Sequence, residues 1–188
     1  MKGRKFRILN RPFSYFRKVI RIGLLSDTHG HIEERVLNFF KECDEVWHAG
    51  DIGTIEVLEE LEAFKKTRAV WGNIDGHILR SACPEHQKFT LKGLRVWITH
   101  IGGYPGRYDI RVREEIRRNP PDLFICGHSH ILKVIPDKKL KLLHMNPGAA
   151  GLSGFHQKRT ALRFCIEGGK PTNLEVLELD RWPEKTSS

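Results

Sequence analysis

The sequence lacks the features that define several large classes of protein. No apolar run approaches the roughly 18 residues that a helix needs to cross a membrane. The four cysteines, at positions 43, 83, 126 and 165, form no Cys-x-x-Cys pair, which argues against a zinc ribbon or a redox dithiol. Isolated thiols of this kind are typical of buried cysteines in a reducing cytosol. We therefore expect a cytoplasmic protein without membrane association.

Acidic residues are missing from the first 21 positions, which hold eight Lys and Arg. The net charge of the chain is +9, so this segment can account for nearly all of the excess. A solvated basic tail is the plainer interpretation, and contact with a polyanion is the alternative. The apolar stretch from Val19 to Leu25 resembles a signal peptide only weakly, because Arg21 interrupts it and no small-residue cleavage site follows. We interpret it as a first strand.

The chain has 188 residues, which is enough for one domain with a buried core. Short apolar runs alternate with amphipathic segments in its first half, a rhythm that favours a mostly parallel sheet covered by helices. Strands are predicted at 19–25, 45–48 and 67–71, and helices at 32–41 and after Thr54, the expected N-cap. We expect a basic N-terminal extension over 1–18, a single domain over 19–182 and a tail over 183–188.

The second half is richer in predicted strands and is expected to add a second sheet. Glycine-containing or Pro-Asp turns separate pairs of strands that read as hairpins. The predicted hairpins are 87–91 with 94–99, 131–135 with 140–145, and 160–166 with 173–179; a helix is predicted at 111–118 and a further strand at 123–126.

Metal-binding side chains follow five of these β-rich runs. The segments are Asp27-Thr28-His29, Gly50-Asp51, Gly72-Asn73-Ile74-Asp75, Thr99-His100 and Gly127-His128-Ser129-His130. Loops that leave the same edge of a sheet converge in space. Carboxylate, amide and imidazole ligands suit Mn²⁺, Fe²⁺, Zn²⁺ or Mg²⁺, and the lack of thiolates argues against a structural zinc site. We expect extended backbone to point alternate residues such as Asp27 and His29 the same way.

Each signal is weak alone, since a single His or Asp is more often a surface or turn residue. In this order, however, the motifs resemble those of the calcineurin-like metallophosphoesterase superfamily. Three segments are similar to its small phosphodiesterase branch: Ser26–Gly30, His48–Asp51 and Asn146–Gly148. The resemblance covers roughly residues 19 to 180. It implies an α/β fold of four layers, an αββα sandwich of two mixed sheets flanked by helices, with metal ions above the strand ends.

The resemblance also implies the site and its chemistry. One ion would be held by Asp27, His29 and His130, the other by Asn73, His100 and His128, with Asp51 bridging them. A hydroxide shared by the two ions would attack phosphorus in line, while Asn73 contacts the phosphate. The implied enzyme is a dinuclear-metal hydrolase of phosphodiester or phosphomonoester bonds. Mn²⁺ is the expected metal, with Fe²⁺, Zn²⁺, Ni²⁺ and Mg²⁺ as alternatives.

One departure concerns the proton donor. Many members of the superfamily carry His directly after the motif Asn, whereas this chain has Ile74. Water, His31, Asp75 or His77 would then protonate the leaving group, although a surface or turn role is the plainer interpretation of each side chain. His48 is interpreted either as a support for the site or as a packed strand-end residue.

Three functions remain open at this point. The first is the phosphoesterase, acting on a small phosphoester for which a nucleotide-derived compound is one candidate. The second is a protein-binding scaffold on the same fold, since one eukaryotic retromer subunit resembles this branch. Nucleic-acid binding is the third, motivated by charge but not favoured, because recognised stacking and groove-reading motifs are absent. A homo-oligomer is compatible with all three.

Overall fold

The computed structural model describes residues 19–182. The predicted extension (1–18) and tail (183–188) lie outside this range, so the division into domains stays a prediction. The first elements are β1 (Ile20–Leu25), α1 (Glu34–Phe39), β2 (Glu45–His48), α2 (Ile55–Phe64), β3 (Lys66–Ala69), α3 (His77–Ala82), β4 (His86–Leu91) and β5 (Leu94–Thr99). They are followed by β6 (Gly103–Tyr104), β7 (Arg107–Tyr108), α4 (Ile110–Arg118), β8 (Leu123–Ile125), β9 (Leu132–Asp137), β10 (Leu142–Pro147), β11 (Lys158–Glu167) and β12 (Lys170–Asp180).

The first sheet has the order β12-β11-β1-β2-β3. Its β1, β2 and β3 run parallel, as the alternation of strands and helices predicted. We expected the last hairpin, β11 with β12, to belong to the second sheet, but it belongs to the first. It adds antiparallel to β1, with Ile22 opposite Phe164. Both residues belong to the apolar core between the sheets, so burial of their side chains fixes this pairing.

The second sheet has the order β4-β5-β8-β10-β9 and is also mixed. The predicted turn between β4 and β5 is present, with positive φ at Lys92 (50°) and Gly93 (84°), the conformation that a two-residue hairpin favours. Strand β9 continues through Pro136 and Asp137, which were predicted as turn residues. Because β9 pairs on one side only, at the edge of the sheet, a proline there is tolerated.

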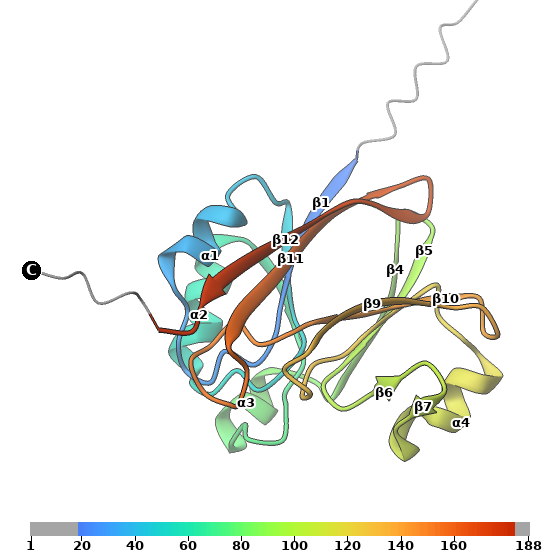
Figure 1. The fold of residues 1–188 in the computed structure, drawn as a ribbon, viewed down its shortest axis with the longest axis horizontal. Coiled ribbons are helices and arrows are strands. Elements are labelled where there is room, and N and C mark those ends of the chain that lie inside the picture. The colour runs from blue at the N-terminus through green and yellow to red at the C-terminus, as the bar shows by residue number, and fades with distance from the viewer. Residues whose placement is uncertain (1–18, 183–188) are drawn as a thin grey trace, which may run out of the picture.

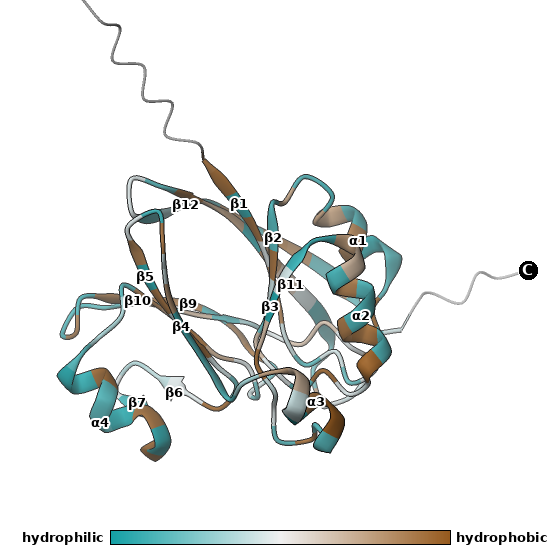
Figure 2. Ribbon diagram, turned by 180° about the vertical axis from the view of Figure 1, so that it is seen from behind, coloured by the Kyte–Doolittle hydropathy of each residue, from teal (hydrophilic) through white to brown (hydrophobic). Residues whose placement is uncertain are grey.

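Four layers follow from where the apolar side chains lie. One buried cluster joins the two sheets and includes Trp47 and Phe164 of the first and Ile98 and Ile125 of the second. Helices α1 and α2 cover the outer face of the first sheet, and α4 covers the second, where Val112 packs with the strands (Figure 1). In Figure 2 each of these helices carries both apolar and hydrophilic residues. The predicted αββα sandwich is confirmed.

The elements that were not predicted are short. They are α3 and the two-residue strands β6 and β7. The predicted helix at 32–41 is also shorter, since α1 spans only Glu34–Phe39. Thr54 stands at the N-cap position of α2 as predicted, but its side chain makes no capping hydrogen bond. No helix within residues 19–182 is both long and apolar enough to span a membrane.

Candidate metal centre

The predicted ligands lie in loops at the carboxyl ends of parallel strands. In the first sheet these loops follow β1, β2 and β3, and in the second they follow β5 and β8. Backbone hydrogen bonds join neighbouring loops, as from His29 N to Asp51 O (3.0 Å) and from Gly127 N to His100 O (3.0 Å). The amide of His128 also reaches the Asp27 carboxylate across the two sheets, at 3.2 Å. The sandwich therefore brings all five segments together, as expected for strand-end loops.

Two groups of side chains present their donor atoms to one another. The first contains Asp27, His29 and His130, and the second contains Asp51, His100 and His128; within each group the donor atoms lie within 4.8 Å of one another. His100 Nε2 connects the groups, since it lies 3.2 Å from Asp51 Oδ1 and 4.0 Å from Asp27 Oδ1.

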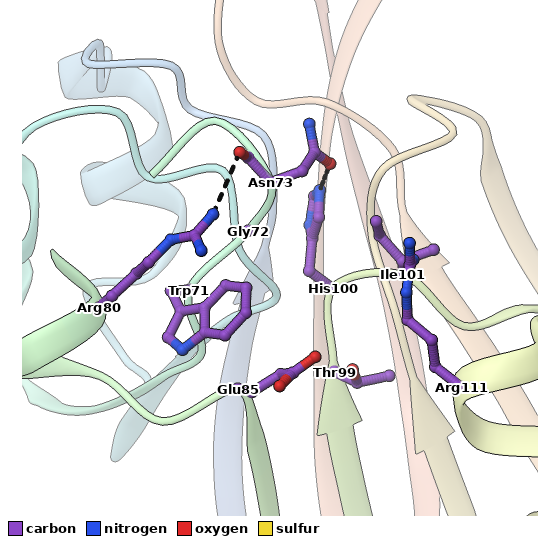
Figure 3. Close-up of a pocket in the computed structure, with 9 residues that line it drawn as sticks. All are labelled: Trp71, Gly72, Asn73, Arg80, Glu85, Thr99, His100, Ile101 and Arg111. Carbon is purple, nitrogen blue, oxygen red and sulfur yellow. Dashed lines mark hydrogen bonds between the residues drawn. The ribbon is translucent and has the colours of Figure 1, made fainter. Parts of the chain in front are cut away.

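The seventh predicted ligand, Asn73, joins the second group. Its Oδ1 lies 3.1 Å from His100 Nε2, although the residue itself is exposed. Figure 3 shows the amide turned towards the imidazole ring. All seven predicted side chains thus gather at one place, and Asp51, which the resemblance implied as a bridge between two ions, lies in the second group.

The backbone that positions these ligands differs from the extended conformation that we expected. Five residues have positive φ, a region that side chains other than glycine enter at a cost in free energy: Asp27 (54°), His29 (49°), Asp51 (53°), His128 (67°) and His130 (56°). In both Asp-x-His and His-x-His, the two alternate side chains are therefore directed by left-handed turns and not by a pleated strand. Such conformations persist only where the surrounding structure enforces them.

Glycines next to the ligands make this crowding possible. A Cβ at Gly72 would overlap the Asp51 carboxylate, and one at Gly127 would overlap Ser26 Oγ. Glycine at both positions therefore permits a close approach of the ligand loops that a side chain would prevent.

Charge around Asp51 and His100 is balanced within the protein. Burial acts to raise the pKa of Asp51, but hydrogen bonds from His100 and from Ile74 N, with nearby positive charge, lower it overall. Burial acts to lower the pKa of His100, but the Asp51 and Asp27 carboxylates raise it overall. His100 Nδ1 donates to Ala49 O at 2.8 Å, so its Nε2 is the nitrogen that faces the carboxylates. A cation at that place would substitute for the proton on Nε2.

His156 supports the site and was not anticipated. Its Nε2 donates to Gly151 O (3.0 Å), which leaves Nδ1 as an acceptor 3.3 Å from His130 Nδ1. His130 therefore donates through Nδ1 and presents the Nε2 lone pair towards Asp27 Oδ1, at 3.3 Å. No local motif marks His156, because it lies 26 residues beyond His130 in the connection to β11.

His48 lies beneath the ligand loops and forms hydrogen bonds to them, which agrees with its interpretation as a support for the site. Gly50 N donates to His48 Nδ1 (3.1 Å), and Nε2 lies 2.8 Å from Thr28 Oγ1, whose hydroxyl donates to Ile52 O (2.9 Å). These bonds require a neutral ring. Burial accordingly lowers the pKa of His48 to about 4. The ring and the hydroxyl tie the loop after β1 to the loop after β2.

Asn146 ties down the loop that carries His128. Its Nδ2 donates to Gly127 O (2.7 Å) and Ser129 Oγ (3.1 Å), and its Oδ1 accepts from Gly148 N (2.9 Å). Asn146 and Pro147 end β10, and the asparagine is buried. The family motif identified the segment 146–148, and the fold shows that it positions the loop that carries His128.

Asp75 and His31 lie differently from the metal-group side chains. The buried Asp75 carboxylate accepts from three backbone amides, Gly72 N (2.7 Å), Gly53 N (2.8 Å) and Ile52 N (3.1 Å). It therefore holds the loops after β2 and β3 together. His31 is exposed, just beyond the first ligand loop.

Beside the second metal group lies a cleft of ≈ 210 Å³. Asn73 and His100 form the wall next to the metal group, and the remaining walls include Trp71, Arg80, Glu85, Ile101 and Arg111 (Figure 3).

The two-sheet sandwich and its strand-end clusters of carboxylates and imidazoles define a metallo-dependent phosphatase-like protein. Residues 20–169 match the calcineurin-like phosphoesterase superfamily domain, and the chain belongs to this family. A "Probable metallophosphoesterase" of Methanothermobacter thermautotrophicus is 30% identical over 135 residues, which are 68% of this chain and 76% of that protein. The family and this name indicate a metallophosphoesterase, a hydrolase that depends on divalent metal ions.

Solved structures share the fold at lower identity. A structure of an archaeal phosphodiesterase is 22% identical, with a TM-score of 0.65, and the match covers 85% of this chain and 100% of that one. Wild-type Vps29 of Entamoeba histolytica, solved in complex with Zn²⁺, is 15% identical with a TM-score of 0.66, and the match covers 86% and 99% of the two chains. At these identities the likeness shows the fold alone.

Proposed function

We propose that the chain hydrolyses phosphodiester or phosphomonoester bonds with two divalent metal ions. Asp27, His29 and His130 would hold one ion; Asn73, His100 and His128 would hold the other; and Asp51 would lie between them. The observation that supports this best is the pairing of two complete donor groups whose atoms lie within 4.8 Å of one another in each group. Bound there, the ions would supply Lewis-acid activation of water and charge neutralisation for in-line attack on phosphorus.

The residues present fit such ions. Oxygen and imidazole nitrogen donors suit divalent metals of borderline hardness, among which we favour Mn²⁺, with Fe²⁺, Zn²⁺, Ni²⁺ and Mg²⁺ as alternatives. His100 and His130 each donate one ring nitrogen away from the site, to Ala49 O and to His156, and so keep the other nitrogen free as a ligand. Two dications against the two carboxylates, Asp27 and Asp51, would leave net positive charge, which favours an anionic phosphoester.

Three further residues receive roles. The exposed amide of Asn73, one of the proposed ligands, can also contact a phosphate oxygen. Asp75 is assigned to positioning in place of proton donation, because three backbone amides occupy its carboxylate. His31 stays a candidate donor, and water is the simpler one, since the His31 side chain is exposed and, within residues 19–182, makes no hydrogen bond that directs its ring towards the ligands. Proton transfer by water favours substrates with good leaving groups.

The alternative is a protein-binding scaffold, as on Vps29-like folds. Loss of metal ligands would be neutral for a scaffold, whereas all seven donor side chains are present here and are supported from behind by His156, His48 and Asn146. Such support maintains ligand geometry that a binding surface does not need. We therefore favour the enzyme.

Hydrolysis of bis(p-nitrophenyl) phosphate by the metal-reconstituted protein tests the proposal. We expect Asp51→Asn and His100→Ala to lower turnover by at least about 10²-fold, the scale of losing a central electrostatic group, with the fold intact by circular dichroism. Glu59→Gln, an exposed change on α2, is the matched control and should retain wild-type turnover. Wild-type-like turnover in both site variants, at verified metal content, would refute the enzyme.

A further inference from the structure

The cleft beside the candidate metal centre contains a cation that is already fixed in place. Arg80 Nε donates to Asp75 O (2.7 Å), and its Nη2 donates to Asn73 O (3.4 Å). The guanidinium carbon lies 4.4 Å from the centre of the Trp71 ring. Within residues 19–182, no carboxylate oxygen lies within 4.0 Å of a nitrogen of the Arg80 side chain. Its position is thus set by carbonyl oxygens and an aromatic face, and its charge is not neutralised.

A second guanidinium reaches the cleft from the opposite side. Arg111 belongs to the first turn of α4, and Figure 3 shows it across the cleft from Arg80. Its Nη1 lies 3.8 Å from Asp109 Oδ1, an ion pair that is too long for a hydrogen bond. That oxygen already accepts from the backbone amide of Arg111 at 3.0 Å, as the cap of the helix. Arg111 is therefore also available to a ligand.

The remaining walls restrict what the ligand can be. One face of the Trp71 ring is covered by Arg80, and the residue also packs against the apolar cluster under α2. Both contacts reduce the aromatic surface on which a base could stack. Glu85 is the one carboxylate among the residues that line the cleft. Two guanidinium groups against one carboxylate leave the cleft positive, and planar guanidinium groups bind phosphate through paired hydrogen bonds.

We propose that this cleft binds a second phosphate group of the substrate, next to the one that is hydrolysed. The substrate class is then a phosphoester that carries a further phosphate, as a nucleoside bisphosphate or a short oligonucleotide does. This inference rests on the proposed function for the location of the first phosphate. Asn73 links the two sites, because its side chain faces His100 and its carbonyl accepts from Arg80.

Calorimetric binding to the Mn²⁺-loaded protein tests the inference without relying on turnover. Three ligands separate the contributions: ribose 5-phosphate has one phosphate, adenosine 5′-monophosphate adds a base, and adenosine 3′,5′-bisphosphate adds the second phosphate. We expect the second phosphate to tighten binding about ten-fold, the scale of one charge-assisted contact, and the base to add little.

Variants of the two opposing charges sharpen the test. Arg111→Gln should remove most of the gain from the second phosphate, whereas Glu85→Gln should increase it because a repelling carboxylate is lost. Arg118→Gln, the same change on an exposed residue of α4 outside the cleft, should leave the gain unchanged. Arg80 is not varied, because its bond to Asn73 O couples it to the metal site.

Equal binding of the mono- and bisphosphate, or an unchanged gain in Arg111→Gln, would overturn the inference. A preference for adenosine 5′-monophosphate over ribose 5-phosphate that Glu85→Gln abolishes would overturn it in favour of a base-binding cleft. Hydrolysis of bis(p-nitrophenyl) phosphate is measured in parallel. Turnover without selectivity for the second phosphate would refute this inference alone, whereas selective binding without turnover would refute the enzyme and leave the cleft standing.

Discussion

His130 and His156 face each other through their Nδ1 atoms, 3.3 Å apart. Because His156 Nε2 is engaged with Gly151 O, the direction of the hydrogen bond is set, and His130 must present Nε2 to the first metal group. A residue outside both donor groups thus fixes the tautomer of one that is proposed to bind a metal ion. Its removal is a direct test of how the site is supported.

We expect His156→Ala to weaken metal binding about 10- to 100-fold, the usual effect of losing a partner that orients a metal-bound imidazole. His156→Gln keeps an acceptor near His130 Nδ1 and should restore part of the affinity. Titration of the metal-free protein with Mn²⁺, followed by calorimetry, measures both. Unchanged affinity in His156→Ala would contradict this role, because it would show that His130 keeps its position without His156.

The three amides on Asp75 predict a structural penalty. Asp75→Ala would leave three backbone donors of the loops after β2 and β3 without their acceptor, and we expect a loss of about 2–4 kcal/mol in the free energy of unfolding. Chemical denaturation measures this loss. Asp75→Asn should lower turnover without removing the alkaline limb of the pH–rate profile. Disappearance of that limb would instead identify Asp75 as the proton donor.

Acid sensitivity is expected from His48. Its pKa is about 4 in the folded protein because the ring is buried, against about 6.5 when unfolded, so the unfolded chain binds the extra proton between these values. The contribution of this residue to stability is complete above pH 6.5 and is lost as the pH falls towards 4. Unfolding free energies measured at pH 7 and pH 4.5 should therefore differ by less in His48→Gln than in the wild type. An equal difference in both proteins would assign the acid sensitivity to other groups.

Two glycines of one loop provide a matched pair. A Cβ at Gly72 would overlap the Asp51 carboxylate, whereas a Cβ at Gly76 would meet nothing within 4 Å. We expect Gly72→Ala to cost about 1–3 kcal/mol of stability and to lower metal affinity, because Asp51 must move. Gly76→Ala should do neither. Thermal unfolding with and without Mn²⁺ compares them, and equal behaviour of the two variants would contradict the close packing of Asp51.

Much of the site was predictable because its ligands are tied to strand ends. Asp51 and His100 each follow a β-rich run within three residues, and parallel strands bring their carboxyl ends to one edge. The predicted grouping came from the family, since spacing alone does not say which imidazole meets which carboxylate. The fold layers followed from the apolar periodicity together with the same resemblance.

The remaining features depend on contacts between distant segments. The left-handed backbone at Asp27 and His128 is maintained by the loops that surround them, and it could not be predicted from the residue types. The β11–β12 hairpin joins the first sheet because Phe164 is buried opposite Ile22, a pairing that local propensity does not encode. His156 and Arg80 act through partners far along the chain or through backbone carbonyls, which leave no motif.

Anomalous diffraction from crystals grown with Mn²⁺ tests the central claim most directly. The account predicts two peaks, one among Asp27, His29 and His130 and one among Asn73, His100 and His128, with an Asp51 oxygen near both. A map at saturating Mn²⁺ with a single peak, or with peaks away from these side chains, would contradict it.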